Sequence, residues 1–202
     1  MLNQKHSIMR RNGAPVIITS LDGGITETIA IIGRASKQFN STLALEHYRR
    51  AHFLPNIDIK SGYLCYSIPA NETYILVATY PDLIAGKICT NVSHMMICNS
   101  EISTKGDEMV ADGRGNLKKV PIDKVSNLSV HAQLITQDLR MYDPGLHPDS
   151  KYLIYAPGVS ISVLDKLKLR VLEWEESFKV VAVDYISFPG CALIQVTSET
   201  RV

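Results

Sequence analysis

The chain has 202 residues, of which 46% are apolar and 20% are charged, a composition typical of a globular protein that buries a substantial core. Lys and Arg number 21 against 20 Asp and Glu, so the net charge of +1 gives the whole molecule no attraction for nucleic acid or anionic membranes. Twelve glycines and nine prolines, spread along the sequence, exclude collagen-like and low-complexity chains.

Short β-branched runs dominate the sequence and predict a mainly β protein. Val16–Thr19 and Thr28–Ile32 are separated by Asp22-Gly23-Gly24, which provides the positive-φ positions of a tight turn, so they form a predicted hairpin. Further runs bounded by Pro, Gly, Asn or Asp predict strands at 63–68, 73–80, 87–98, 130–138, 151–155, 166–172, 178–185 and 191–197.

One helix is predicted, over Thr42–His52, because Ser41 or Thr42 can cap its start and Pro55 ends it. The segment Asp165–Leu172 instead alternates apolar and basic residues with period two, which indicates a half-exposed strand. Its basic side chains, Lys166, Lys168 and Arg170, have two interpretations. They form a solvated strand face, which we favour, or a basic stripe that a ring of identical subunits repeats as a charged collar.

Residues 101–124 contain few large apolar side chains and several glycines, and they are interpreted as a long central loop. This loop divides the chain into a β module over residues 1–100, a linker over 101–124 and a second β module over 125–202. A shift of 104 residues places Glu72 on Glu176 and Gly86 on Gly190. Either the chain is a duplication of one small antiparallel barrel or sandwich, or two hairpins agree by coincidence.

Candidate catalytic and ligand-binding groups lack the spacing that known sites require. The four cysteines, Cys65, Cys89, Cys98 and Cys191, form no C-x-x-C pair, so zinc is not expected, and Gly190-Cys191 lacks the second glycine of a nucleophile elbow. The central glycines lack the Lys-Ser/Thr ending of a phosphate-binding loop. We therefore expect no enzyme activity, no metal and no cofactor. The remaining enzyme hypothesis is a hydrolase-like site formed by His131, Asp138 and His147, with Cys191 as a further candidate.

The first thirteen residues contain no apolar run of about 7 to 15 residues, which a secretory signal requires, and apolar runs elsewhere are strand-sized. We therefore expect a cytoplasmic product without a membrane span, in which the cysteines are free and mostly buried. Four Asn-X-Ser/Thr sequons leave open a secreted, disulfide-bonded binding module; they begin at Asn40, Asn71, Asn91 and Asn127.

The run Phe178–Val196, an aromatic-led strand, a loop ending in Pro189-Gly190 and a short final strand, resembles the closing hairpin of the β-barrel neck proteins of tailed bacteriophages. Residues 72–98 are similar, and Met9–Ile18 resembles the basic N-terminal strand of that head-completion, stopper or head-tail connector family. The resemblance covers about a third of the chain.

This resemblance implies a structural virion component that is made in the host cytoplasm. Such a protein forms a homo-oligomeric ring between the portal or adaptor and the tail, and DNA passes transiently through its lumen. A tail-completion or baseplate part is the alternative within the same class. In this hypothesis the central loop lies at a subunit contact or lines the lumen, through Lys105, Arg114, Lys118 and Lys119.

Overall fold

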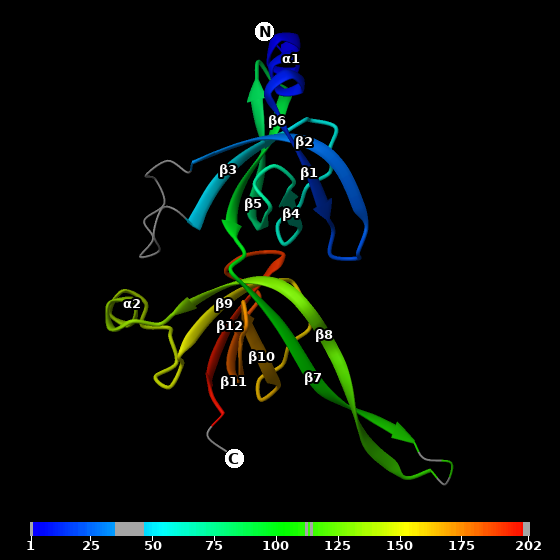
Figure 1. Ribbon diagram of the computed structural model, residues 1–202, viewed down its shortest axis with the longest axis vertical. Coiled ribbons are helices and arrows are strands. Elements are labelled where there is room, and N and C mark those ends of the chain that lie inside the picture. The colour runs from blue at the N-terminus through cyan, green and yellow to red at the C-terminus, as the bar shows by residue number, and fades with distance from the viewer. Residues whose placement is uncertain (1, 35–46, 112, 114, 200–202) are drawn as a thin grey trace. The chain divides into compact units, whose positions relative to one another are not determined.

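The computed structural model describes residues 2–34, 47–111, 113 and 115–199. The chain divides into two compact units, one of residues 1–98 with 185–191 and the other of residues 99–184 with 192–202. Each unit contains one closed six-stranded antiparallel barrel (Figure 1). The prediction of a mainly β chain with two small antiparallel barrels is confirmed.

The first barrel, barrel 1, has the strand order β1-β2-β3-β6-β5-β4 and closes where β4 pairs with β1. Its strands are β1 (Ala14–Thr19), β2 (Ile25–Arg34), β3 (Tyr48–Phe53), β4 (Leu64–Ser67), β5 (Glu72–Ile84) and β6 (Lys87–Ile97). The predicted hairpin over the first two runs is β1 and β2, joined through Asp22-Gly23-Gly24. Inward-facing side chains such as Val16, Phe53 and Leu76 fill the barrel.

The second barrel, barrel 2, has the order β10-β11-β12-β9-β8-β7 and closes where β7 pairs with β10. Its strands are β7 (Ser100–Ala111), β8 (Leu117–Leu134), β9 (Tyr152–Pro157), β10 (Lys166–Val171), β11 (Trp174–Asp184) and β12 (Cys191–Ser198). In β10, Leu167 and Leu169 are buried while Lys166, Lys168 and Arg170 are exposed, as the period-two pattern predicts.

The two barrels repeat one strand order: β7 to β12 are arranged as β1 to β6 are. A β-bulge also recurs at the same place. Val77 is the unpaired residue between β5 and β6, and Val181 is the unpaired residue between β11 and β12. These two residues are 104 positions apart, the shift found in the sequence. A shared strand order with a shared bulge is what duplication of one barrel produces, because bulges are retained as designed features of a sheet.

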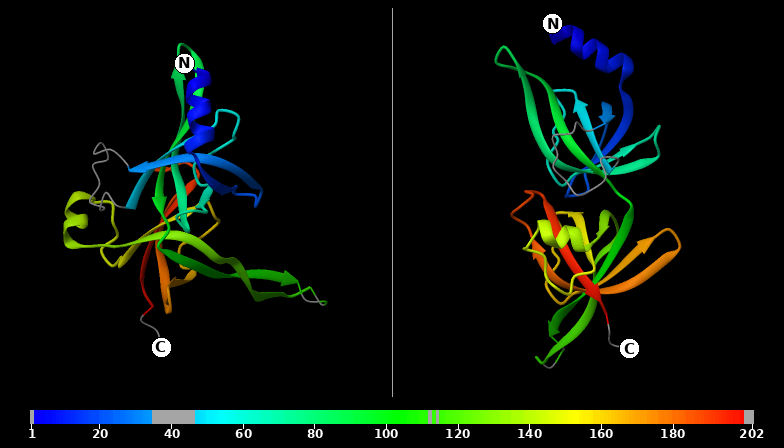
Figure 2. Two further views of the ribbon diagram at one scale, coloured as in Figure 1. Left: turned by 45° about the horizontal axis from the view of Figure 1, so that its top comes forward. Right: turned by 90° about the vertical axis from the view of Figure 1, so that its left-hand side faces the viewer.

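Three expectations about local structure need correction. The strand expected over 130–138 ends at Leu134, and Gln137 and Asp138 belong to helix α2 (Gln137–Tyr142), because Thr136 caps a helix there. Residues 101–124, expected to be a loop, lie mostly in β7 and β8, which form a long hairpin extending beyond barrel 2 (Figures 1 and 2). Strands outside a barrel bury neither face in a core, so their sequence needs no alternation of apolar and polar residues to mark them as strands. Of the predicted helix, Thr42–Glu46 lies outside the described residues, and Tyr48–His52 forms part of β3. There, pairing with β2 and β6 overrides helix propensity.

Two short helices occur among the described residues. Helix α1 (Leu2–Asn12) places Met9 against barrel 1, and its His6 ring shares a 2.9 Å hydrogen bond between Nε2 and the Cys89 carbonyl. Helix α2 (Gln137–Tyr142) begins at Thr136, whose hydroxyl accepts a hydrogen bond from the Leu139 amide. Neither described helix is long and apolar enough to cross a membrane.

Candidate functional site

Four residues are predicted to line an intersubunit or lumenal segment, and the structure places them along the β7–β8 hairpin. Lys105 lies in β7, exposed, with its ammonium 3.9 Å from Asp123. Lys118 and Lys119 lie in β8, where they pair with Val110 and Met109 of β7. Arg114 lies outside the described residues. The hairpin therefore carries at least three of the predicted basic residues, as parts of strands.

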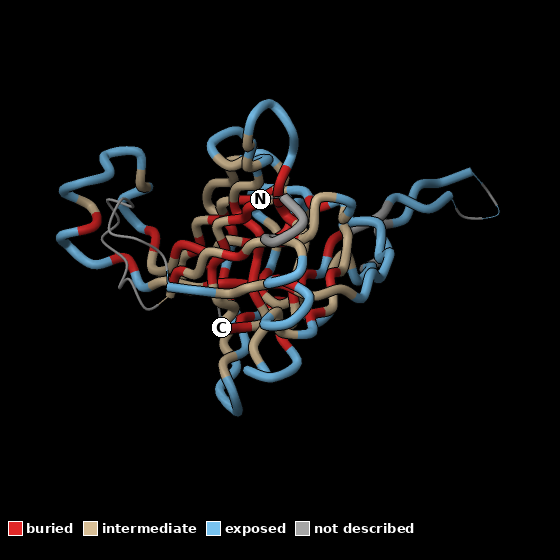
Figure 3. Tube along the Cα trace, turned by 90° about the horizontal axis from the view of Figure 1, so that it is seen from above, coloured by how far each residue is buried: buried red, intermediate tan, exposed pale blue. Residues whose placement is uncertain are grey.

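The outer half of this hairpin exposes large apolar side chains. Five residues here are more than a third exposed: Met109, Val110, Leu117, Val120 and Ile122. Figure 3 shows this half of the hairpin as an exposed arm. Beyond barrel 2 the described pairings of β7 and β8 are with each other alone, so the outer edges of both strands are open there. The exposed side chains and the open strand edges of the hairpin are the surface available for association.

The base of the hairpin is fixed to barrel 2 by a bulge in β8. Lys124 is the unpaired residue there, since Thr104 pairs with Val125 and Lys105 with Asp123. A bulge redirects a side chain, and the Lys124 stem lies over Gly106, where an added Cβ would come within 2.1 Å of it. Its ammonium reaches Asp165 at 2.8 Å, in a largely buried ion pair.

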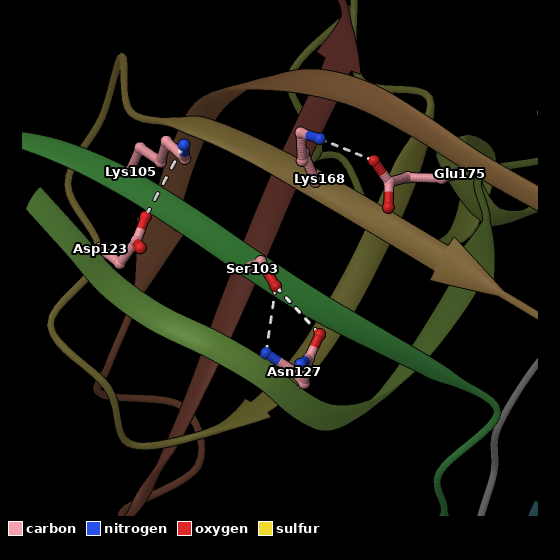
Figure 4. Close-up of polar contacts among 6 residues, drawn as sticks. All are labelled: Ser103, Lys105, Asp123, Asn127, Lys168 and Glu175. Atoms are coloured by element: carbon pink, nitrogen blue, oxygen red, sulfur yellow. Dashed lines mark hydrogen bonds and ion pairs between the residues drawn. The ribbon is translucent and has the colours of Figure 1, made fainter. Parts of the chain in front are cut away.

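A second irregularity lies two residues further along β8. Ser103 faces both Ser126 and Asn127, because Ile102 pairs with Leu128 and Thr104 with Val125. The backbone N–H of Asn127 donates a 3.0 Å hydrogen bond to the Ser103 hydroxyl (Figure 4). The backbone of Asn127 takes a positive φ of 48°. This contact fixes the outer face of β7 beside the lysines of β10.

Three lysines stand side by side on the outer face of barrel 2. Lys166 of β10 is directly opposite Lys105 of β7 on one side and Lys179 of β11 on the other. We call this set the lysine row. In the next row Lys168 stands between Ser103 and Ser177. Like charges directly opposite each other in a sheet are destabilising, so the row is not explained by the stability of the sheet.

Acidic side chains lie at the margins of these rows. Lys166 is 2.5 Å from Glu199, and Lys168 is 2.7 Å from Glu175 (Figure 4). Arg170 pairs with Glu101 in the third row. Among the described residues Lys179 forms no ion pair. Exposed ion pairs contribute about 0–1 kcal/mol each, so an external anion can replace these carboxylates at little cost.

The two lysine-bearing rows border a shallow groove of about 380 Å³. Its lining combines ammonium groups with hydroxyls, both of which donate hydrogen bonds to anions. The described residues that line it are Ser103, Lys105, Asp123, Val125, Ser126, Lys166, Lys168, Ser177 and Glu199. This chemistry suits the binding of phosphate oxygens.

The residues of the enzyme hypothesis differ in their surroundings. His131 of β8 is fully buried, with its ring 6.1 Å from that of Tyr155. Asp138 and His147 are exposed, and His147 Nδ1 accepts a hydrogen bond from the Asp149 amide. Burial raises the pKa of the Cys191 thiol to about 11, which disfavours the thiolate. These environments do not point to a shared catalytic pocket.

Within the described ranges no group of three or more His, Cys, Asp or Glu side chains is placed to hold a metal ion. The four cysteines are unpaired, three of them buried and Cys98 partly buried, which confirms the prediction of free, mostly buried thiols.

The comparisons with known proteins add no family to this description. No protein-family model matches the sequence, and no curated protein matches it either. The site therefore rests on the geometry of barrel 2 alone.

Sequence reasoning found part of this surface. The period-two pattern places Lys166 and Lys168 on an exposed strand face, and Lys105 is among the predicted residues, although for a different role. Lys179 was missed, because only the strand order β7-β10-β11 brings it beside Lys166. Its position one residue after the buried Phe178 in a period-two strand is the signal that places it on the outer face.

Proposed function

We propose that this protein is a structural, ring-forming component of a tailed-phage virion, of the head-completion or head-tail connector type. The observation that carries the proposal is the β7–β8 hairpin, a projecting element whose exposed apolar side chains bury nothing within barrel 2. Exposed apolar groups of this kind mark contact surfaces. The sequence resemblance of residues 72–98 and 178–196 to neck-protein hairpins supports the same class.

In this role the hairpin of one copy packs against a different surface of the next copy. Such a contact is heterologous, and repeated head-to-tail contacts generate a closed ring when the rotation between neighbours closes. The portal or adaptor and the tail are the proposed partners above and below the ring, and DNA passes through its lumen. A tail-completion or baseplate part is the alternative position within the same particle.

The proposal is tested by measuring the mass of the purified chain by light scattering, together with negative-stain images of the assembled species. We expect a defined oligomer with a central opening. The double variant Val110→Glu/Leu117→Glu should reduce it to monomers, because carboxylates replace two exposed apolar contacts of the hairpin.

The matched control is Ile25→Glu/Leu172→Glu, which adds the same two charges at exposed apolar positions away from the hairpin. It should assemble normally. A chain that stays strictly monomeric at high concentration, and that binds neither portal nor tail proteins, would contradict the proposal. Equal loss of assembly in both double variants would show that the hairpin is not the contact.

A further inference from the structure

We propose that the lysine row and Lys168, on the outer face of barrel 2, bind the phosphate backbone of double-stranded nucleic acid. The inference rests on the proposed function, since it names the surface of the ring subunit that contacts DNA. It does not follow from the overall charge, which is +1. It follows from strand register, which gathers lysines from three strands.

The spacing of the lysine row fits a phosphate backbone. Neighbouring strands lie about 4.8 Å apart, so three adjacent strands span roughly 10 Å. The long, flexible lysine side chains of adjacent strands can therefore reach neighbouring phosphates of one DNA strand. Lys105 and Lys166 are 68% and 72% exposed, so their ammonium groups are accessible to a bound polymer. Contact with successive phosphates would relieve the repulsion among the three ammonium groups.

Hydroxyl groups next to the lysines extend the same chemistry. Ser103 and Ser177 stand on either side of Lys168, and Ser126 lies in the same groove. Serine hydroxyls and lysines are common donors to phosphate oxygens, and these contacts carry no base information. The surface is therefore expected to bind duplex DNA without sequence preference, as a protein that lets DNA pass requires.

The acidic residues at the margins keep the binding weak. Asp123 and Glu199 lie within 4 Å of Lys105 and Lys166 and compete with phosphate for them. Weak binding with rapid exchange suits a surface past which DNA moves. The competition also provides a test. If the lysine row binds phosphate, removing these carboxylates should strengthen DNA binding. If the row has only a structural role, their removal should leave DNA binding unchanged.

The experiment measures binding of the full-length protein to a fluorescein-labelled 30-base-pair DNA duplex by anisotropy, over a range of salt concentrations. We expect Lys166→Gln/Lys179→Gln to bind roughly tenfold more weakly at low salt. The slope of log K against log salt should fall in magnitude by about 1.8, because two phosphate contacts are lost. Asp123→Asn/Glu199→Gln should bind several-fold more tightly.

The matched control is Lys60→Gln/Lys87→Gln, which removes two exposed lysines from barrel 1. It should leave the slope unchanged. Equal losses in the two lysine variants, or the absence of any salt-dependent binding by the natural sequence, would overturn the proposal. Light scattering on the same samples reports assembly separately. If the natural sequence assembles but does not bind DNA, this inference alone is refuted. If the natural sequence stays monomeric and binds neither portal nor tail proteins, the proposed function is contradicted.

Discussion

At the residue scale, Gly106 and Lys124 connect the hairpin to barrel 2. The absence of a side chain at Gly106 lets the Lys124 stem cross β7 and reach Asp165, which also accepts a 2.8 Å hydrogen bond from the Ser162 amide. A Cβ at position 106 would come within 2.1 Å of Lys124 Cε, so the lysine side chain would have to leave its present path. One missing methyl group thus allows a largely buried ion pair between β8 and the segment before β10.

We expect Gly106→Ala to lower the free energy of unfolding of barrel 2 by about 1.5–3 kcal/mol, because displaced Lys124 no longer satisfies Asp165. Denaturant titration followed by Trp174 fluorescence measures this change. Gly113→Ala is the control, since a Cβ at Gly113 meets nothing within 4 Å. In a Lys124→Ala background the cost of Gly106→Ala should largely disappear. The same cost in both backgrounds would contradict the explanation.

His94, on the outer face of barrel 1, makes the free energy of unfolding depend on pH. Burial, and in addition the Arg50 guanidinium opposite it, lower the pKa of His94 below its usual 6.5. The folded state therefore binds fewer protons there than the unfolded state does. The contribution of His94 to the free energy of unfolding is therefore complete above about pH 6.5. It is lost as the pH falls through the pKa that His94 has in the folded protein.

We expect the free energy of unfolding, followed by far-ultraviolet circular dichroism, to decrease between pH 7 and pH 5. His94→Gln should reduce this decrease, because the replacement does not titrate. His147→Gln, at an exposed position, should leave it unchanged. If the two variants have the same pH profile as the natural sequence, His94 is not responsible.

Thiol reactivity separates the free-cysteine structure from a disulfide-bonded one. Burial raises the pKa of Cys65 from 9.0 to about 12, which lowers its thiolate fraction near neutral pH roughly a thousandfold. Ellman's reagent should therefore label Cys65 very slowly in the folded protein. After denaturation without reductant it should detect all four thiols. Fewer than four would favour the secreted, disulfide-bonded alternative.

At the element scale, the β7–β8 hairpin is the largest difference between the two barrels. In the equivalent hairpin of barrel 1, the strands β1 and β2 are 6 and 10 residues long, whereas β7 and β8 are 12 and 18 residues long. Two barrels with the same strand order thus differ by one projecting hairpin. Because the outer half of the arm is exposed, it contributes little to the stability of barrel 2 itself.

We expect a chain in which Met109–Lys119 is replaced by an Asn-Gly turn to retain the stability of barrel 2 within about 0.5 kcal/mol, as surface changes usually do. Asn-Gly suits the two-residue turn that would then join Glu108 and Val120. Denaturant titration measures stability, and light scattering should show loss of assembly. A large fall in stability would mean that the arm packs on its own barrel.

The elements differ in how far their sequence predicts them. The alternation in Lys166–Val171 determines both a strand and its exposed face, because burial on one side selects apolar residues at every second position. In β3, Ala51 and its basic neighbours suit a helix as well as a strand, and only pairing with β2 and β6 decides. The sequence does not predict the β7–β8 hairpin, because two strands that pair with each other in solvent need no alternation of apolar and polar residues. The lysine row depends on strand order, which local sequence does not contain.

At the scale of the whole molecule, the described residues of each barrel form a hydrophobic core of their own, and a smaller cluster packs Leu139 of α2 against Leu153 of β9. The core of barrel 1 includes Phe53 and Leu76, that of barrel 2 includes Phe178 and Ile154, and no residue belongs to both. Each barrel closes through its own strands, so each has the features of an independent folding unit. Loss of one core should therefore leave the other barrel folded.

The single tryptophan allows this independence to be measured. Trp174 lies in β11 of barrel 2, with its ring 6.4 Å from that of Phe178. Phe178→Ala should cost barrel 2 about 3–5 kcal/mol and move the tryptophan fluorescence transition to lower denaturant. Phe53→Ala, an equal truncation in barrel 1, should leave that transition in place while part of the circular dichroism signal is lost earlier. If Phe53→Ala moves both signals together, the barrels unfold as one cooperative unit, and barrel 2 does not present its lysine row and hairpin independently of barrel 1.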